Sequence, residues 1–151
     1  MLIFQTGDLL QSNADALVNA VNCEGCMGKG IARQFKLQFP KNNAEYVKIC
    51  KSGDLRPGRL HYYKERGKIV INFPTKDKWR EKSKMKYIED GLNALVLLID
   101  ELKIKSVAIP ALGSGNGGLP WEEVKRIILQ KLRTATPCVT VYIYEPLETQ
   151  F

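Results

Sequence analysis

Two glycine-rich segments of this sequence carry residue types that can hold an anion. Residues 19–32 (NAVNCEGCMGKGIA) and 109–121 (IPALGSGNGGLPW) each run from an apolar stretch, through closely spaced glycines, into a helical pattern. Such turns expose main-chain N–H groups, which together with the first amides of a helix can cradle a diphosphate. Tight-turn geometry alone explains one glycine better than three, so we interpret the segments as two sides of one diphosphate site.

The second segment also fits a dinucleotide-binding pattern. Gly113, Gly115 and Gly118 satisfy G-x-G-x-x-G, but a dinucleotide fold places this pattern after its first strand and continues with further βαβ units. Only about thirty residues follow it here. A nicotinamide-dinucleotide domain is therefore disfavoured.

A lysine lies in a third segment, residues 73–80 (FPTKDKWR), directly after a predicted strand. A lysine beside a loop proline is more often simply solvated. At a strand end that faces a ligand, however, partial desolvation can turn a lysine amine into a nucleophile, and an amine can attack the anomeric carbon of a ribose. Lys76 is therefore the candidate nucleophile. The basic run beside it is either a DNA-backbone contact or a solvated helix start, and it comprises Lys78, Arg80, Lys82, Lys84 and Lys86.

Other side chains give weaker signals. Asp8 follows the first predicted strand and could accept a hydrogen bond from an exocyclic amino group, although turn aspartates are common. Cys23 and Cys26 form a C-x-x-C, but no second ligand pair at zinc-finger spacing accompanies them. We therefore expect neither a metal site nor a cofactor.

Composition bounds the class of protein. The 151 residues are 44% hydrophobic and 26% charged, which predicts one folded domain over residues 1–151. No apolar run approaches membrane-spanning length and the start lacks a basic leader, so we expect a cytoplasmic protein with no membrane contact. The net charge of +7 favours anionic partners, nucleic acid included, although it also suits a solubility charge.

Strand and helix patterns alternate along the chain. Strands are predicted at residues 2–6, 16–20, 60–64, 68–72, 107–110 and 139–145. Helices are predicted from residue 31 to a stop at Pro40, and at 42–52, 85–102 and 121–132. This alternation predicts a mostly parallel or mixed sheet of about six strands with helices on both faces, and ligand chemistry at the carboxyl ends of the strands.

Four blocks, taken in order, resemble the macrodomain family. They are residues 7–9, 19–32, 73–80 and 109–121. The resemblance runs nearly end to end, and the blocks MGKGIA and FPTKDKWR are similar to the family's DarG antitoxin branch, which removes ADP-ribose from thymidine in DNA modified by a DarT toxin.

The resemblance implies a three-layer α/β/α fold and a role for each block. Adenine would meet Asp8 and Leu9, and the distal ribose would meet Asn19, Ala20, Val21 and Asn22. The diphosphate would lie between two sets of residues, Gly28, Lys29, Gly30 and Ile31 on one side and Gly113, Ser114, Gly115 and Asn116 on the other. Lys76 aligns with the family's catalytic lysine, and Thr75 with a contact beside it.

The implied activity is that of a monomeric ADP-ribosyl glycohydrolase acting on ADP-ribosylated DNA, with a DarT-like toxin as a possible partner. Two alternatives stay open: release of ADP-ribose from protein glutamate or from O-acetyl-ADP-ribose, and non-catalytic ADP-ribose reading. The protein-directed branch of the family pairs the lysine with an aspartate in the second glycine loop. Here Gly117 stands at that position, which resembles the DNA-directed branch more closely.

Overall fold

The computed structural model describes residues 1–133 and 137–147. Its strands are β1 (Leu2–Gln5), β2 (Ala16–Val21), β3 (His61–Glu65), β4 (Lys68–Pro74), β5 (Ser106–Ile109) and β6 (Thr140–Tyr144). Its α-helices are α1 (Gly30–Gln38), α2 (Pro40–Ser52), α3 (Met85–Glu101) and α4 (Trp121–Leu132), and two short 3₁₀ turns are η1 (Leu9–Gln11) and η2 (Gly115–Gly117).

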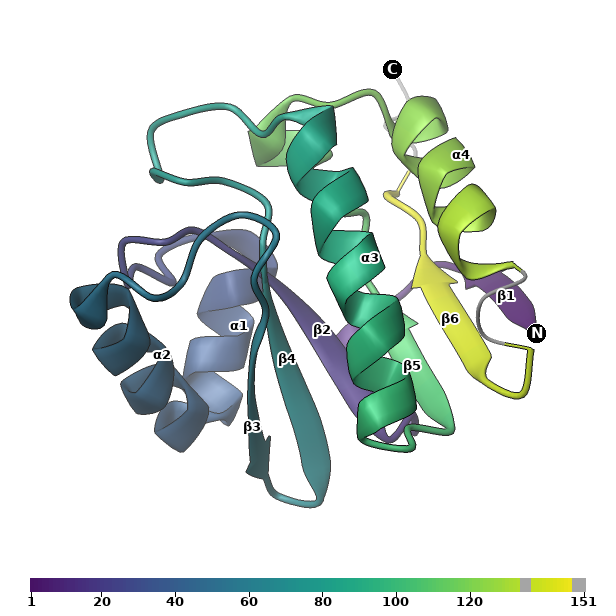
Figure 1. The fold of residues 1–151 in the computed structure, drawn as a ribbon, viewed down its shortest axis with the longest axis horizontal. Coiled ribbons are helices and arrows are strands. Elements are labelled where there is room, and N and C mark those ends of the chain that lie inside the picture. The colour runs from purple at the N-terminus through teal and green to yellow at the C-terminus, as the bar shows by residue number, and fades with distance from the viewer. Residues whose placement is uncertain (134–136, 148–151) are drawn as a thin grey trace.

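The strands form one mixed sheet in the order β1-β6-β5-β2-β4-β3 (Figure 1). Every neighbouring pair is parallel except β3 and β4, which form an antiparallel hairpin. The carboxyl ends of β1, β2, β4, β5 and β6 therefore share one edge of the sheet, as the strand and helix alternation predicted.

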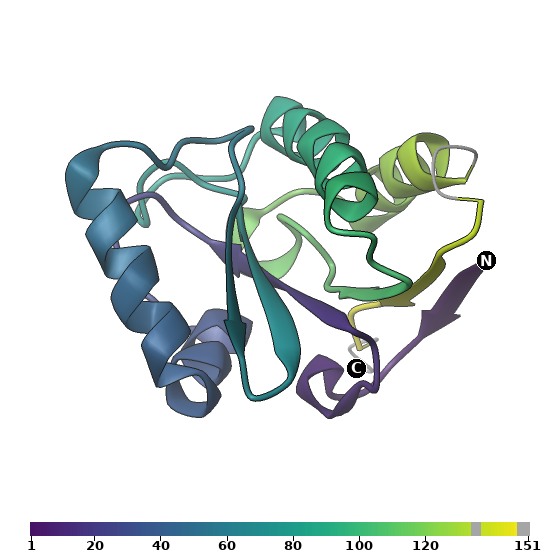
Figure 2. The same cartoon turned by 60° about the horizontal axis from the view of Figure 1, so that its bottom comes forward.

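Helices cover both faces of this sheet. The apolar residues of α3 and α4 pack with one face, and those of α1, α2 and η1 pack with the other. Figure 2 shows α3 and α4 above the sheet and α1 and η1 below it. Successive side chains of a strand point to opposite faces of the sheet, so Val18 faces α3 and its neighbour Leu17 faces the other helix layer. The three-layer α/β/α prediction is confirmed.

Most element boundaries differ from the sequence prediction by no more than one residue, and two differ by two residues. Pro40 does end α1, but it also starts α2 at the helix's first turn, two residues before the predicted start. The reason is a cap from a distant strand, because the Glu65 carboxylate accepts hydrogen bonds from Asn42 N at 2.8 Å and Lys41 N at 3.4 Å. Strand β4 runs to Pro74, two residues further than predicted, because it stays paired with β2 up to Val21.

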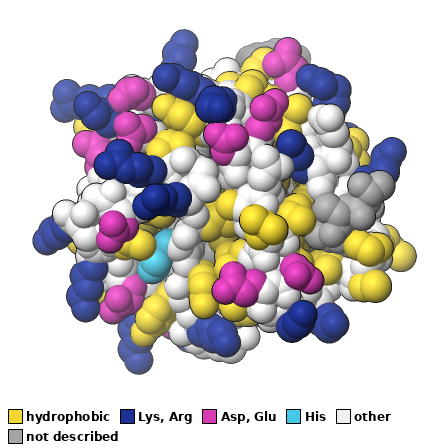
Figure 3. All heavy atoms as spheres, viewed as in Figure 1, with side chains coloured by type: hydrophobic (Ala, Val, Ile, Leu, Met, Phe, Trp, Pro, Cys, Tyr) yellow, Lys and Arg dark blue, Asp and Glu magenta, His cyan; other side chains and the backbone are white. Residues whose placement is uncertain are grey.

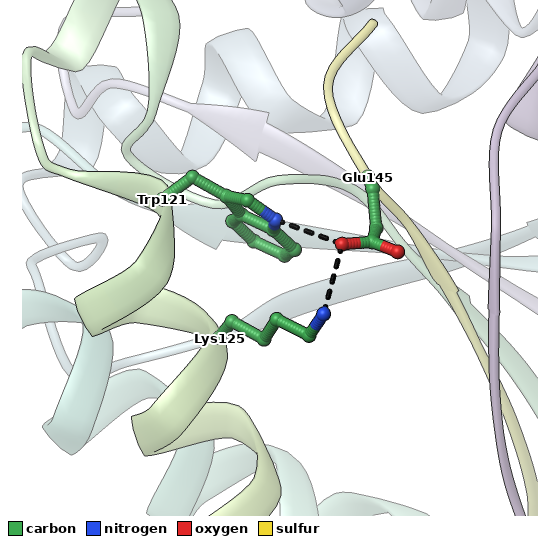
Figure 4. Close-up of polar contacts among 3 residues, drawn as sticks. All are labelled: Trp121, Lys125 and Glu145. Carbon is green, nitrogen blue, oxygen red and sulfur yellow. Dashed lines mark hydrogen bonds and ion pairs between the residues drawn. The ribbon is translucent and has the colours of Figure 1, made fainter. Parts of the chain in front are cut away.

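A three-residue cluster fixes the start of α4 (Figure 4). Both Trp121 Nε1 and Lys125 Nζ donate to the Glu145 carboxylate at 3.1 Å, just after β6. The indole N–H and the ammonium hold the pKa of Glu145 below its usual range. The Lys125 ammonium also lies 4.5 Å from the centre of the Phe4 ring of β1. This cluster anchors the helix that follows the second glycine segment.

Buried amides link the middle of the sheet to α2. Asn42 and Asn72 are fully buried and exchange side-chain hydrogen bonds of 2.9 and 3.3 Å. The second N–H of the Asn72 amide donates to His61 Nδ1 at 2.9 Å. His61 therefore accepts as a neutral ring, and burial lowers its pKa.

Among the described residues, no helix has both the length and the apolar character needed to cross a bilayer.

We expect His61 to make folding stability depend on pH. A lowered pKa means that the folded state favours the neutral ring, so this contribution is complete above the ordinary pKa of 6.5 and is lost as the pH falls through the folded value. His61→Gln keeps an acceptor that does not titrate. Urea denaturation at pH 7 and pH 5 should show a smaller loss of stability in the variant than in the unmodified protein. Equal losses would contradict this role.

Candidate functional site

Both glycine-rich segments lie at the carboxyl ends of the parallel strands (Figure 1). One follows β2 and leads into α1, and the other follows β5 and contains η2. A Cβ built on Gly30 would lie 3.8 Å from Asn116 Nδ2, so the end of the first segment is within contact range of the second. The structure thus brings together the residues that the sequence suggested for one anion.

The start of α1 is open to an anion. Its cap residue, Lys29, makes no side-chain hydrogen bond to the helix, and the first turn contains no acidic residue. Gly30 has φ +57°, a left-handed conformation that glycine adopts without strain. In contrast, α4 carries Glu122 and Glu123 in its first turn. The amides and positive dipole end of α1 are therefore available to a phosphate.

The second segment is compact and contains a buried hydroxyl. Gly113 has φ +71°, and a Cβ there would lie 2.6 Å from Leu119 Cδ1, so no larger residue fits without rearrangement. Ser114 precedes η2, and its Oγ is buried without a hydrogen-bond partner in the described part of the chain. A buried hydroxyl left without a partner costs about 1–3 kcal/mol, which a ligand oxygen could recover.

The asparagines of the first segment lie inward. Asn22 is 8% exposed; its amide donates to Cys26 O at 2.8 Å and accepts from Glu24 N and the Tyr46 hydroxyl, each at 2.9 Å. Asn19 is fully buried and donates to Asn72 at 3.4 Å, while its Oδ1 has no partner among the described residues. Both side chains shape the loop, and their contact with a ribose stays a prediction.

The remaining predicted ligand residues of the first segment and the bridging loop differ in their exposure. Thr75 and Val21 are buried at 6% and 4% exposure, and Ala20 is partly buried. Gly28 and Lys29 are exposed just before α1, and Ile31 is partly buried on its first turn.

A third loop, residues 75–84, lies between the two glycine segments, and we call it the bridging loop. Its beginning is tied to the first segment by main-chain bonds of 2.9 Å, from Thr75 N to Val21 O and from Cys23 N to Asp77 O. Its end is tied to the second segment by a 3.0 Å bond from Ser83 N to Gly117 O.

Lys76 is held within this loop. It is partly buried, and its Nζ donates to Trp79 O at 3.5 Å. Trp79 N in turn donates to the Glu24 carboxylate of the first segment at 2.8 Å. The ammonium thus lies on the loop that connects the two candidate anion-binding segments.

The contact between Ser83 and Gly117 leaves no space for a side chain at position 117. A Cβ on Gly117 would lie 2.3 Å from Ser83 Oγ and 3.0 Å from Ser83 Cβ. Ser83 is 6% exposed, and its Oγ has no partner within the described ranges. Ser83 has no distinctive sequence signal, because a serine before a helix is ordinarily interpreted as a cap.

Asp8 and Leu9 follow β1. Asp8 is exposed, and its Oδ1 accepts from Leu10 N at 3.0 Å as the cap of η1. Leu9 is 2% exposed. The turn role of Asp8 is therefore observed, while adenine recognition by this pair stays a prediction.

In the C-x-x-C of the first segment, Cys23 lacks the lowered thiol pKa that favours redox chemistry. Burial, and secondarily Asp77, raises the pKa of the Cys23 thiol to about 12, so it is protonated near neutrality. Within residues 1–133 and 137–147, no three His, Cys, Asp or Glu side chains are grouped to hold a metal ion. Two surface hollows of about 320 and 350 Å³ lie elsewhere, against β1 with α4 and at the β3–β4 hairpin.

Comparisons with known proteins agree with this geometry. The Macro domain family model matches residues 18–128. The chain is 50% identical to a DNA ADP-ribosyl glycohydrolase of Thermus aquaticus over 98% of its own length, and spans 42% of that protein. The solved macrodomain of Mycobacterium tuberculosis DarG is 45% identical with a TM-score of 0.95, over 97% of this chain and 99% of that one.

A second solved structure contains a ligand. It is described as Thermosipho africanus DarTG in complex with ADP-ribose; it is 35% identical, with a TM-score of 0.88, over 99% of this chain and 43% of that one. The family match covers well over half of the sequence, and the shared fold extends over nearly all of it. This chain belongs to the macrodomain family.

Proposed function

We propose that this chain is an ADP-ribosyl glycohydrolase that releases ADP-ribose from thymidine in ADP-ribosylated DNA. The observation that carries the proposal is the convergence of two glycine-rich loops on a third loop that bears Lys76. The relatives named DNA ADP-ribosyl glycohydrolase support the choice of substrate. Since the chain spans only 42% of their length, the activity of the longer proteins is part of the proposal.

The diphosphate would be bound from two sides. The open amides at the start of α1, from Gly28 to Ile31 in sequence, would take one phosphate. The amides of residues 113–116 and the unpartnered hydroxyl of Ser114 would take the other. Adenine would then extend toward Asp8 and Leu9, and the distal ribose toward Asn22 and Lys76.

Lys76 would supply the covalent chemistry. Its amine attacks C1″ of the distal ribose, a C–N bond forms, and the bond between C1″ and the modified base breaks with its electron pair moving to the base. The proton lost by the amine passes to the departing base. The lysine glycosylamine then opens to an imine at C1″, as the N–H proton passes to the ring oxygen that leaves C1″. Water adds to the imine and the C1″–N bond breaks, which releases ADP-ribose and regenerates the amine.

Position 117 favours a DNA substrate over a protein substrate. The protein-directed branch uses an aspartate there, whereas Ser83 occupies the space into which any side chain at Gly117 would project. The net charge of +7 also suits a polyanionic substrate. We place this activity in the cytoplasm, in a monomer, with a DarT-like enzyme as the source of the modified DNA.

Parallel assays on ADP-ribosylated oligonucleotides and on glutamate-modified protein test the substrate. We expect release from the oligonucleotide and little from the protein. Preferred release from protein would overturn the DNA assignment, and tight ADP-ribose binding without release from either would identify a reader.

Replacing Lys76 should separate binding from chemistry. The side chain is partly buried and makes one 3.5 Å hydrogen bond, so Lys76→Ala should fold normally and still bind ADP-ribose. Release from modified DNA should fall by roughly 100-fold or more, because the nucleophile is lost. Borohydride should trap a covalent adduct with the unmodified protein and none with Lys76→Arg. Undiminished turnover of Lys76→Ala would remove the lysine from the mechanism.

A side chain added at position 117 should push the bridging loop away from the second glycine-rich segment. Overpacking against Ser83 should make Gly117→Ala less stable by about 1–3 kcal/mol, measured by urea denaturation. Ser83→Gly removes the Cβ and Oγ that would be struck, so it should recover part of this loss when combined with Gly117→Ala. A stable single variant, or a double variant without recovery, would contradict the steric argument.

A further inference from the structure

Trp79 is a large apolar side chain that the core does not use. It is 45% exposed, although it lies in the bridging loop three residues from the candidate nucleophile. The other exposed aromatic residue in the described part of the chain is Tyr62 on β3, at 40%. Packing in the core therefore does not explain why a tryptophan stands at this position beside the candidate nucleophile.

The main chain of Trp79 is fixed on both sides. Its N–H donates to the Glu24 carboxylate at 2.8 Å, and its carbonyl accepts from Lys76 Nζ at 3.5 Å. The position of the indole is therefore coupled to the first glycine segment and to the ammonium. These bonds use only main-chain atoms of Trp79, so they leave the indole ring itself available to a ligand.

Positive charge surrounds the indole. The Arg80 guanidinium lies 4.8 Å from the centre of the indole ring. Residues 77–86 contain five basic and two acidic side chains, and within the described residues only Lys86 of the five forms an ion pair, with Asp90 at 3.7 Å. Figure 3 shows Lys and Arg side chains, with Asp and Glu among them, at the upper left of the molecule, where Figure 1 draws the bridging loop.

Aromatic rings interleaved with unpaired cations are typical of single-stranded nucleic acid binding. Bases stack on the rings, and the backbone phosphates meet the basic side chains. An enzyme that acts on a base must also receive it outside a duplex stack. A protein partner could use the same indole, but the local excess of positive charge favours a polyanion.

We propose that Trp79 and Arg80 form a stacking platform for the nucleotide that flanks the modified one in single-stranded DNA. This inference rests on the proposed function and adds to it a specificity-determining contact outside the ADP-ribose. The platform contacts the DNA strand that carries the modification, so it lowers the KM for an oligonucleotide. It has no effect on the KM for an isolated nucleoside, which has no flanking nucleotide.

The test compares two substrates with one chemistry, ADP-ribosyl-thymidine as a nucleoside and within a short single-stranded oligonucleotide. Trp79→Ala should raise the KM for the oligonucleotide by roughly ten-fold, with kcat and nucleoside hydrolysis unchanged. Trp79→Phe keeps a ring and should retain most of the affinity. Tyr62→Ala, a matched exposed aromatic residue on β3, should leave both substrates unaffected.

The outcomes separate the platform from the proposed function. Equal losses on both substrates would make Trp79 a structural residue, and no loss on either would remove it from DNA recognition while leaving the activity intact. Should the unmodified protein cleave neither substrate, the proposed function fails and the platform is judged by fluorescence. An unmodified oligonucleotide should then quench an emission that Trp79→Phe lacks, and absence of quenching would overturn the platform.

Discussion

The bridging loop is held at both ends by main-chain hydrogen bonds, and the rest of the site takes its geometry from them. Thr75 and Asp77 are bound to the β2 end, and Ser83 is bound to Gly117. Since main-chain groups make these bonds, they constrain the path of the backbone more than the identity of the side chains. Lys76 is thereby kept between the two glycine-rich segments, which are far apart in sequence and are the candidate anion-binding segments.

Buried polar side chains beneath these loops fix the register of the central strands, and with it the positions at which the strands end. Asn19 of β2 is paired in register with Asn72 of β4, and Asn72 reaches both Asn42 of α2 and His61 of β3. A one-residue slip of β4 would turn Asn72 toward the opposite layer and bury unpaired amides. The network therefore specifies register, and the loops after β2 and β4 emerge side by side as a result.

The sequence predicted those features that local patterns determine. The apolar stripes of α3 and α4 gave their bounds to within one residue at each end, and the glycine clusters marked both loops. What it could not supply were long-range partners. The early start of α2 depends on Glu65, which lies on β3. The requirement for glycine at position 117 depends on the close approach of Ser83. The inward position of Asn19 depends on an amide more than fifty residues away.

Electrostatics then distinguishes one helix start from another. Each α-helix presents a partial positive charge and free amides at its first turn. In α2 and α4 the chain supplies acidic groups of its own, from Glu65 and from Glu122 with Glu123. The first turns of α1 and α3 have no acidic residue and no side-chain cap, and they follow the first glycine segment and the bridging loop respectively. The two helix starts left without internal anions are thus those of α1 and α3, and the positive end of α3 adds to the charge of the basic run that leads into it. An external anion is favoured at the starts of α1 and α3, because the protein's own carboxylates lie at the other two helix starts.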